Sequence, residues 1–395
     1  MLRTNRRVSR SVLTAEGEIV LKRYVLRPKS EEDKQRMLET EGISCIYPLD
    51  IALGIDRLPF KMTPGLMLRI AGVAAQVPSY ERTESILKDM CNVELSDDTI
   101  RSVTNYVGGI VFQDNCRKSA EARASYEGGR LRSTYDKGGV LYMSVDGATL
   151  NTRAKGDGGS TWRENKLAMA YSSDDIETYK DASGDTCHRI NKREYATFIG
   201  SVDEFKWHWL SAAVDAGYGK YKEAVVLSDG APWIRNVHAE LFSDAQRILD
   251  LFHLKENTGD YFKALFPKET QAEERKQWSD RVCAELEAGR WKDVLKELKA
   301  FKRRKLPPHV VDLPKYIEDN QDAIDYPTYK EKGYVVGSGS IESSNKTVLQ
   351  SRMKQAGMRW AVEQGQGMVA LKARQESGKW SSVETLLYKH LGIEQ

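Results

Sequence analysis

Three stretches in the middle of the chain indicate the fold class: KGGVLYMSVDGATL (137–150) is followed by ENKLAMAYSS (164–173) and YATFIGSV (195–202). Each stretch is a run of apolar and β-branched residues bounded by Gly, Ser or Asn, which is typical of buried strands. The apolar part of the first stretch ends at Asp146, directly before a glycine. We therefore expect three consecutive strands here.

Helices and strands then alternate. We expect a helix over 203–216, a strand in AVVLSDGAPWI (224–234) that ends at Asp229, a helix over 232–241, and a strand in AQRILDLFHL (245–254). Three strands, a helix, a strand, a helix and a strand predict a mixed α/β sheet covered by helices. This is the order of elements expected of an RNase H-like fold.

The segment 259–332 interrupts this order because its apolar residues recur with helical spacing. A helical insertion is the simplest account of it. From residue 333 to 360 the sequence GYVVGSGSIESSNKTVLQSRMKQAGMRW predicts a short apolar strand, a glycine-serine turn and a long helix that closes the domain.

The N-terminal third predicts a hairpin and then helices. SVLTAEGEIVLKRYVLRP (11–28) alternates apolar and polar residues around a Glu-Gly turn. Three short helices are expected, over 64–75, over 79–90, and from an N-cap at Ser96 onwards. The second and third have the proportions of a helix-turn-helix, although an ordinary helical hairpin fits the spacing equally well. Exposed residues of the third helix would include Arg101, Ser102 and Asn105.

The chain therefore divides into four expected parts. These are a basic β-hairpin region (1–60), a helix-turn-helix-like DNA-binding domain (61–115), an RNase H-like catalytic domain (136–258 plus 333–395) and the helical insertion (259–332).

Composition narrows the class of protein. The chain has 395 residues, of which 40% are hydrophobic, so it can bury a substantial core and is not a disordered protein. Its mean hydropathy of −0.55 and the lack of an apolar run of about 18 residues argue against a membrane span. Five scattered cysteines without a CxxC pair indicate free thiols, a reducing compartment and no structural zinc.

Charge is nearly balanced but unevenly distributed. The formal net charge is +3, from 60 basic and 57 acidic residues, yet 1–29 and 290–305 each carry eight Lys or Arg against two acids. Two basic clusters suggest a polyanionic partner, and a solvated surface is the ordinary alternative.

Three carboxylates are candidates for metal chemistry. Asp146 and Asp229 come at strand ends, and Glu342 falls in the first turn of a helix if Ser340 is the N-cap. Each alone has an ordinary structural explanation, since Asp-Gly is a common turn and Glu is common in a first helical turn. Together, three oxygen ligands suit Mg²⁺ or Mn²⁺, and two such ions about 4 Å apart support phosphodiester displacement.

Four blocks of sequence resemble a known family. VDGATLNTR (145–153), SDGAPWIRN (228–236), the step from Asp250 to His253, and 337–360 resemble the signature blocks of bacterial insertion-sequence transposases of the DDE type, in the Mutator-like superfamily. The similarity extends from the hairpin to Trp360. Family members commonly carry further sequence ahead of the hairpin, which bears on how DNA ends are recognised.

The resemblance implies an activity and its partners. It implies an RNase H-like catalytic domain that uses Mg²⁺ or Mn²⁺, with a pair of ions expected. This domain would cleave double-stranded DNA at the transposon ends and join the ends to target DNA. A homo-oligomer on DNA, in the bacterial cytoplasm at the nucleoid and without a membrane partner, is expected. An inactive or domesticated DNA-binding derivative and an RNase H-like nuclease without strand transfer are the alternatives, because the same carboxylates serve hydrolysis and transfer.

Site residues carry over at matching positions. The acidic triad falls on Asp146, Asp229 and Glu342, and the Asp-x-x-His element falls on Asp250 and His253. His253 is expected to line the site and contact the scissile phosphate, whereas a single histidine after an apolar strand is ordinarily a hydrogen-bonded core residue.

Weaker candidates for DNA contact lie elsewhere. Arg101 and Asn105 would contact DNA from the third helix, and backbone phosphates would be contacted by Arg303 and Arg304 in the 302–305 run and by Arg352, Lys354 and Arg359. Trp233 and Trp360 are candidates to stack on an unpaired base, with burial in the core as the favoured alternative.

Overall fold

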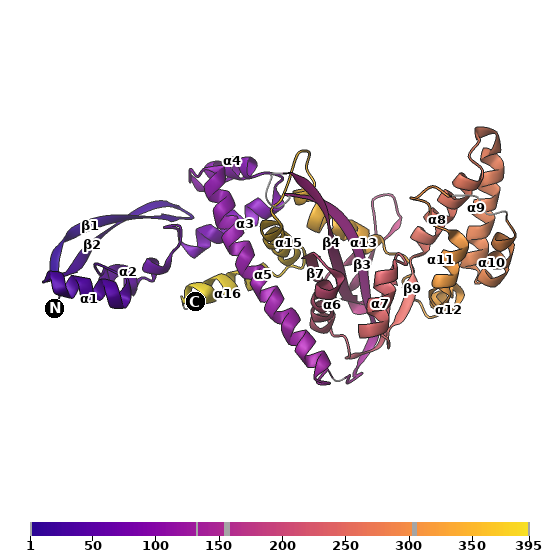
Figure 1. Ribbon diagram of the computed structural model, residues 1–395, viewed down its shortest axis with the longest axis horizontal. Coiled ribbons are helices and arrows are strands. Elements are labelled where there is room, and N and C mark those ends of the chain that lie inside the picture. Colours follow the sequence, from indigo (N-terminus) through magenta and orange to yellow (C-terminus); the bar gives the residue numbers. More distant parts are fainter. Residues whose placement is uncertain (1, 132, 154–158, 302–305, 394–395) are drawn as a thin grey trace. The chain divides into compact units, whose positions relative to one another are not determined.

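The computed structural model describes residues 2–131, 133–153, 159–301 and 306–393 (Figure 1). The chain separates into two compact units. One comprises 1–115, 152–160 and 348–395, and the other comprises 116–151 and 161–347.

A five-stranded mixed sheet forms the centre of the second unit, in the order β7-β4-β3-β8-β9. Strand β3 (Lys137–Arg153) pairs in parallel with β8 (Tyr221–Ser228), and β8 pairs in parallel with β9 (Gln246–Leu249). Strand β4 (Ser160–Ser172) is antiparallel to β7 (Glu194–Ile199). The expected mixed α/β class is confirmed.

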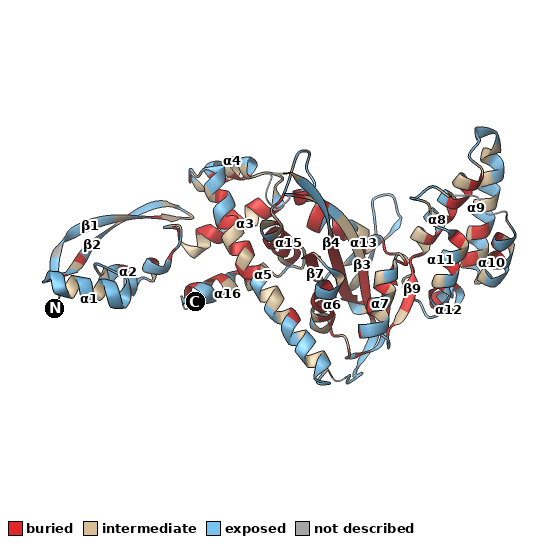
Figure 2. Ribbon diagram, in the orientation of Figure 1, coloured by how far each residue is buried: buried red, intermediate tan, exposed pale blue. Residues whose placement is uncertain are grey.

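Two helices of this unit follow the expected positions closely. Helix α6 (Val202–Ala216) is capped by Ser201, and α7 (Pro232–Leu241) begins at its proline. Trp209 of α6 is fully buried, and its ring lies 4.8 Å from that of Phe242 after α7. Figure 2 shows the middle of β3 and the second half of β4 as buried. The carboxyl ends of β3 and β8 are thereby fixed by a well-packed core.

Three strand predictions need correction. Strand β3 continues to Arg153 instead of ending at Asp146, because Gly147 does not adopt a positive φ and no turn forms there. The strand expected over 245–254 ends at Leu249, where Asp250 caps helix α8 (Leu251–Leu265). A hairpin of β5 (Ile176–Lys180) and β6 (Thr186–Ile190) was not expected, because its strands are mostly polar and exposed.

The helical character expected over 259–332 is confirmed in its described part. Helix α8 is followed by α9 (Ala272–Glu287), α10 (Trp291–Ala300), α11 (Leu313–Asp319) and α12 (Tyr326–Glu331). Short 3-10 turns lie at Glu269–Gln271 and Gln321–Ala323. An aromatic cluster stabilises the segment, in which the Trp278 ring lies 5.7 Å from Phe262 and 4.9 Å from Phe301.

The region after residue 333 differs from expectation. No strand forms at 334–338, and Ser338, not Ser340, is the N-cap of helix α13 (Gly339–Ser344). The expected long helix becomes α13, a π-helical turn (Asn345–Gln350) and the short α14 (Ser351–Met353). Helices α15 (Val362–Glu376) and α16 (Trp380–Leu391) complete the chain's described part.

The first unit begins with the expected hairpin. Strand β1 (Leu2–Thr14) pairs with β2 (Gly17–Pro28), and α1 (Glu31–Glu41), α2 (Pro48–Ala52) and a 3-10 turn (Ile55–Arg57) follow. Asp50 of α2 is 1% exposed and forms ion pairs with Arg10 and Arg23 of the two strands. These two arginines of the basic N-terminal cluster therefore serve the fold.

Three helices follow, as expected, but the third is not short. Helix α3 spans Pro64–Gln76, α4 spans Tyr80–Cys91 behind its N-cap Ser79, and α5 spans Asp97–Glu127. The Ser96 hydroxyl accepts the Thr99 N–H at 3.3 Å, as the capping prediction requires. In the first unit, α5 meets α15 at Gly108 and Gly367, where a β-carbon on Gly108 would lie 2.9 Å from the Gly367 backbone. No helix in the described ranges is long and apolar enough to cross a membrane.

Candidate active site

Two of the predicted carboxylates lie at the same edge of the sheet. The parallel pairing of β3 with β8 ends at Ser144 and Leu227, two residues before Asp146 and Asp229 respectively. We expected Asp146 at the end of its strand. It instead lies within β3, two residues beyond the end of the parallel ladder. Because parallel strands present their carboxyl ends at one edge, both side chains lie at the position where α/β sheets bind ligands.

Asp146 is held by donors and influenced by a neighbouring charge. Its Oδ1 accepts the Gly147 N–H at 2.7 Å, and its Oδ2 accepts the side-chain amide of Asn345. Burial raises the pKa of Asp146, the Gly147 hydrogen bond opposes this, and the negative charge of Asp229 raises it further. A cation beside Asp146 would relieve both effects.

Asp229 lies in a tight turn after β8. Its Oδ1 accepts the Ala231 N–H at 2.9 Å, and its backbone carbonyl accepts the Tyr316 hydroxyl at 2.5 Å. Gly230 has φ +83°, and a β-carbon there would lie 2.9 Å from the Tyr316 ring and 2.8 Å from Leu249. The turn therefore requires glycine, and α11 supports it through Tyr316.

Asp250 and His253 form a buried pair at the start of α8. Asp250 is 0% exposed, and its carboxylate accepts the backbone N–H groups of His253, at 2.7 Å, and of Ser338. His253 Nδ1 lies 3.3 Å from Asp250 Oδ1, and 27% of the histidine side chain is exposed. Asp250 thus anchors both the histidine and the loop that precedes Glu342.

The charges at this site determine the protonation of His253. Its contact with Asp250 raises the pKa of His253 to about 9, burial opposes this, and the charges of Asp229 and Glu342 raise it further. Burial alone would raise the pKa of Asp250, but the hydrogen bonds from His253 and Ser338 hold it below its ordinary value. The site therefore contains an imidazolium at neutral pH, surrounded by carboxylates.

Glu342 lies where the sequence analysis expected it relative to its helix. It is in the first turn of α13, is half-buried, and acts electrostatically on His253. Ser344, two residues further on, bonds to the Tyr195 hydroxyl at 2.7 Å and so fixes this helix against β7. Asp146, Asp229, the Asp250–His253 pair and Glu342 thus come from four separated segments, and the charges of Asp229, Asp250 and Glu342 all act on His253.

The donor set suits a divalent cation by its chemistry. Carboxylate oxygens are the ligands that Mg²⁺ and Mn²⁺ prefer, and Asp146 is a half-buried carboxylate near a second negative charge. Among the residues that the structure describes, no three His, Cys, Asp or Glu side chains are arranged closely enough to hold a metal ion. The expected convergence of the three carboxylates within one metal site stays a prediction.

Sequence reasoning missed two supporting residues. Asn345 follows Glu342 by three residues, so helical spacing places it on the same side of the chain, and this signal was available. Tyr316 lies 87 residues from Asp229, and no local pattern points to the contact. Together with Asp229, His253 and Lys315, Tyr316 lines a cavity of about 400 Å³.

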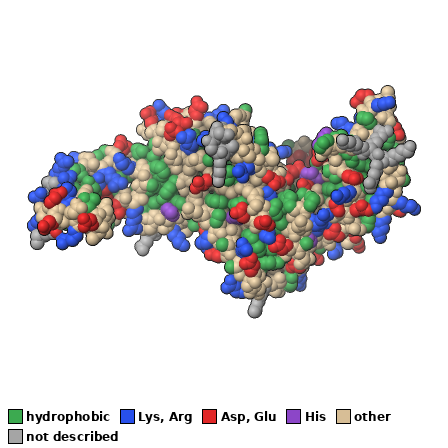
Figure 3. All heavy atoms as spheres, in the orientation of Figure 1, with side chains coloured by type: hydrophobic (Ala, Val, Ile, Leu, Met, Phe, Trp, Pro, Cys, Tyr) green, Lys and Arg blue, Asp and Glu red, His purple; other side chains and the backbone are tan. Residues whose placement is uncertain are grey.

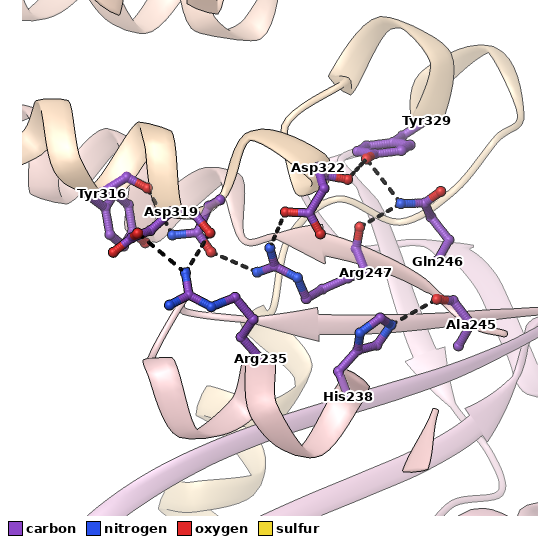
Figure 4. Close-up of polar contacts among 10 residues, drawn as sticks. Arg235, His238, Ala245, Gln246, Arg247, Tyr316, Asp319, Asp322 and Tyr329 are labelled. Atoms are coloured by element: carbon purple, nitrogen blue, oxygen red, sulfur yellow. Dashed lines mark hydrogen bonds and ion pairs between the residues drawn. The ribbon is translucent and has the colours of Figure 1, made fainter. Parts of the chain in front are cut away.

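A polar network connects the helical segment to the sheet (Figure 4). Arg247 of β9 is 2% exposed and donates to Asn320 Oδ1 at 2.6 Å, while its other terminal nitrogen pairs with Asp322. Arg235 of α7 donates to the Asp319 carbonyl at 2.5 Å. These contacts fix α11, and with it Tyr316, against the strand ends that carry Asp229 and Asp250.

One of the DNA-contact predictions is corrected by burial. Arg352 is 1% exposed, donates to the carbonyls of Ala74 at 2.8 Å and Pro78 at 3.1 Å, and lies over the rings of Tyr80 and Trp360. It is a core residue of the first unit and does not reach a phosphate. Its guanidinium group thereby donates to one carbonyl near the end of α3 and to one in the turn before α4.

The remaining candidates lie in different settings. Lys354, Arg359 and Arg101 are exposed, and Arg101 pairs with Asp98, while Asn105 is half-buried. Arg303 and Arg304, with the rest of the 302–305 run, lie outside the described residues. Trp360 is buried and donates to the Met353 carbonyl at 3.2 Å, so the core alternative holds for it, and Trp233 is half-buried beside Phe205.

Comparison of the chain with models of known protein families and with curated proteins found no match.

Proposed function

We propose that this protein is a DDE-type transposase, which cleaves DNA at transposon ends and joins the ends to a target. The observation that carries the proposal is that Asp146 and Asp229 both follow the parallel ladder of β3 and β8, and that the charges of Asp229 and Glu342 both act on His253. The strand order and the helical segment 259–332 support an RNase H-like catalytic domain with a helical insertion.

The chain's residues have distinct roles in this proposal. Asp146, Asp229 and Glu342 would hold Mg²⁺ or Mn²⁺, which supplies activation of the attacking oxygen and stabilisation of the leaving oxygen when bound. The His253 imidazolium, oriented by Asp250, supplies a positive charge for a non-bridging phosphate oxygen. Asn345 keeps the Asp146 carboxylate in place by donating to Oδ2.

The proposed reaction has two displacements. Water first cleaves a phosphodiester at the transposon end and releases a 3′-hydroxyl and a 5′-phosphate. That 3′-hydroxyl then attacks a phosphodiester of the target, forms a new phosphodiester bond and displaces the 3′-oxygen of the target strand, which leaves as a 3′-hydroxyl. We also propose that two or more copies act together on paired ends at the bacterial nucleoid, and that α4 and α5 contribute a helix-turn-helix-like DNA contact.

The test uses the purified full-length chain and a labelled duplex that contains the DNA flanking its gene. In Mg²⁺ we expect nicking at a fixed position, followed by joining to a supercoiled plasmid, and we expect EDTA to abolish both. Nicking without joining would support the nuclease without strand transfer. Binding without nicking in Mg²⁺ or Mn²⁺ would overturn the proposal in favour of a DNA-binding derivative.

A further inference from the structure

A second cavity in the second unit lies beside the loop that carries Glu342. Its volume is about 740 Å³, and the β5–β6 hairpin forms one wall and residues 333–343 form the other. Ser340 and Ser343, which flank Glu342, both line it. It shares no lining residue with the cavity that Asp229 and His253 line. A molecule bound here would therefore approach the candidate active site from the Glu342 side.

The lining of this cavity favours an anion. Arg189 and Arg193 contribute positive charge, His188 contributes an imidazole, and none of the described residues that line it is acidic. The neighbouring acid Glu177, which pairs with Arg189 across the hairpin, accepts the Asn191 amide at 3.4 Å and is not part of the lining. In contrast, basic and acidic side chains are interspersed over the face of the protein shown in Figure 3.

The same cavity also offers flat and apolar surfaces. Tyr142 and Tyr171 stack at 5.4 Å in its lining, and the Arg189 guanidinium lies 5.4 Å from the centre of the exposed Tyr179 ring. Tyr142 and Tyr171 are buried, so Tyr179 is the ring that a base can reach, and a cationic group beside an exposed ring is a feature by which proteins bind a nucleic acid strand. The cavity is also larger than a single phosphate requires.

We propose that this cleft, formed by the β5–β6 hairpin and residues 333–343, binds the DNA strand that leads to the candidate active site. Arg189 and Arg193 contact its phosphates, and Tyr179 stacks against a base or sugar at the rim. This inference rests on the proposed function, because it names the surface that delivers the substrate to Asp146, Asp229 and Glu342. A strand placed here passes Ser340 and Ser343 before it reaches Glu342.

The first test measures the salt dependence of binding to a fluorescein-labelled DNA duplex with a single-stranded 3′ tail, by fluorescence anisotropy. We expect Arg189→Ala/Arg193→Ala to weaken binding about tenfold and to reduce the slope of log K against log salt by about 1.5 to 2, because two phosphate contacts are lost. The control Lys220→Ala/Lys222→Ala removes the same charge from exposed positions outside the cleft, and it should leave the slope nearly unchanged. Equal slopes for the two double variants would overturn the proposal.

A second pair of variants tests the same surface by adding charge instead of removing it. Thr178→Glu places a carboxylate in the cleft and should weaken binding, whereas Ser183→Glu places one at the exposed turn of the same hairpin and should have little effect. Equal effects of the two would contradict the cleft. The outcomes separate the two proposals. If the wild-type protein nicks DNA but the cleft variants bind DNA as well as their controls do, only the proposed cleft is refuted. If DNA binding depends on the cleft but the wild-type protein nicks no DNA, only the proposed transposase function is refuted.

Discussion

At the residue scale, the proposed contact of His253 with a phosphate depends on its pairing with Asp250. Asp250→Asn keeps an N-cap acceptor for α8 but removes the negative charge beside the imidazole. We expect the pKa of His253 to fall from about 9 toward its ordinary value of 6.5, measured by NMR titration of the imidazole. Asp325→Asn, at the N-cap of α12, is the matched control and should leave this pKa unchanged.

The same pair determines a pH dependence of stability. Because the folded-state pKa of His253 is raised, its interaction with Asp250 contributes stability that is fully present below about pH 6.5 and is lost as the pH rises through about 9. The difference in unfolding free energy between wild type and Asp250→Asn should therefore shrink between pH 6 and pH 10 in urea titrations. A constant difference over that range would show that the imidazolium does not stabilise the fold.

At the element scale, two adjacent glycines of α5 should respond in opposite directions. Gly108 faces the Gly367 backbone, so Gly108→Ala forces α5 and α15 apart and should lower the unfolding free energy by about 1 to 3 kcal/mol. A β-carbon on Gly109 would meet no described atom within 4 Å, so Gly109→Ala should raise the unfolding free energy by about 0.5 to 1 kcal/mol, because alanine has the higher helix propensity. The measurement is thermal or urea unfolding, and the same sign for both would refute the close approach of the helices.

Elements with local signals were predicted well from the sequence. Ser79 and Ser96 cap their helices as expected, and α7 spans 232–241 as expected, because a cap or a helix-starting proline acts within one turn. The β5–β6 hairpin lacks an apolar face, so hydrophobic periodicity does not reveal it. The π-helical turn after α13 has no sequence signature that we used.

The candidate site was only partly predictable for a related reason. Its five charged groups were named from the sequence, since all five lie in the four blocks that resemble a family. The contacts that hold them join distant residues: Asn345 and Asp146 are 199 positions apart, and Tyr316 and Asp229 are 87 apart. The burial of Arg352 also depends on tertiary packing, because nothing near it in sequence indicates a core position.

At the scale of the whole molecule, the formal net charge is only +3, so the proposed DNA binding would rely on local basic clusters. Neutralising Lys302, Arg303, Arg304 and Lys305 together should reduce the slope of log K against log salt by about 3 to 4, if each contacts one phosphate. The measurement is DNA binding by anisotropy at several salt concentrations. An unchanged slope would show that these four residues do not contact DNA. The effect of Arg189→Ala/Arg193→Ala on the slope would not be altered by that result.

The Asp229→Asn variant tests the proposed active site most sharply. The substitution preserves shape and the turn acceptor for the Ala231 N–H, but it removes a negative ligand from the proposed cation site. With the flanking-DNA duplex in Mg²⁺, we predict that folding and binding match wild type while nicking and joining fall by several orders of magnitude. Nicking and joining at a near wild-type rate would contradict the role given to Asp229, and with it the proposed active site.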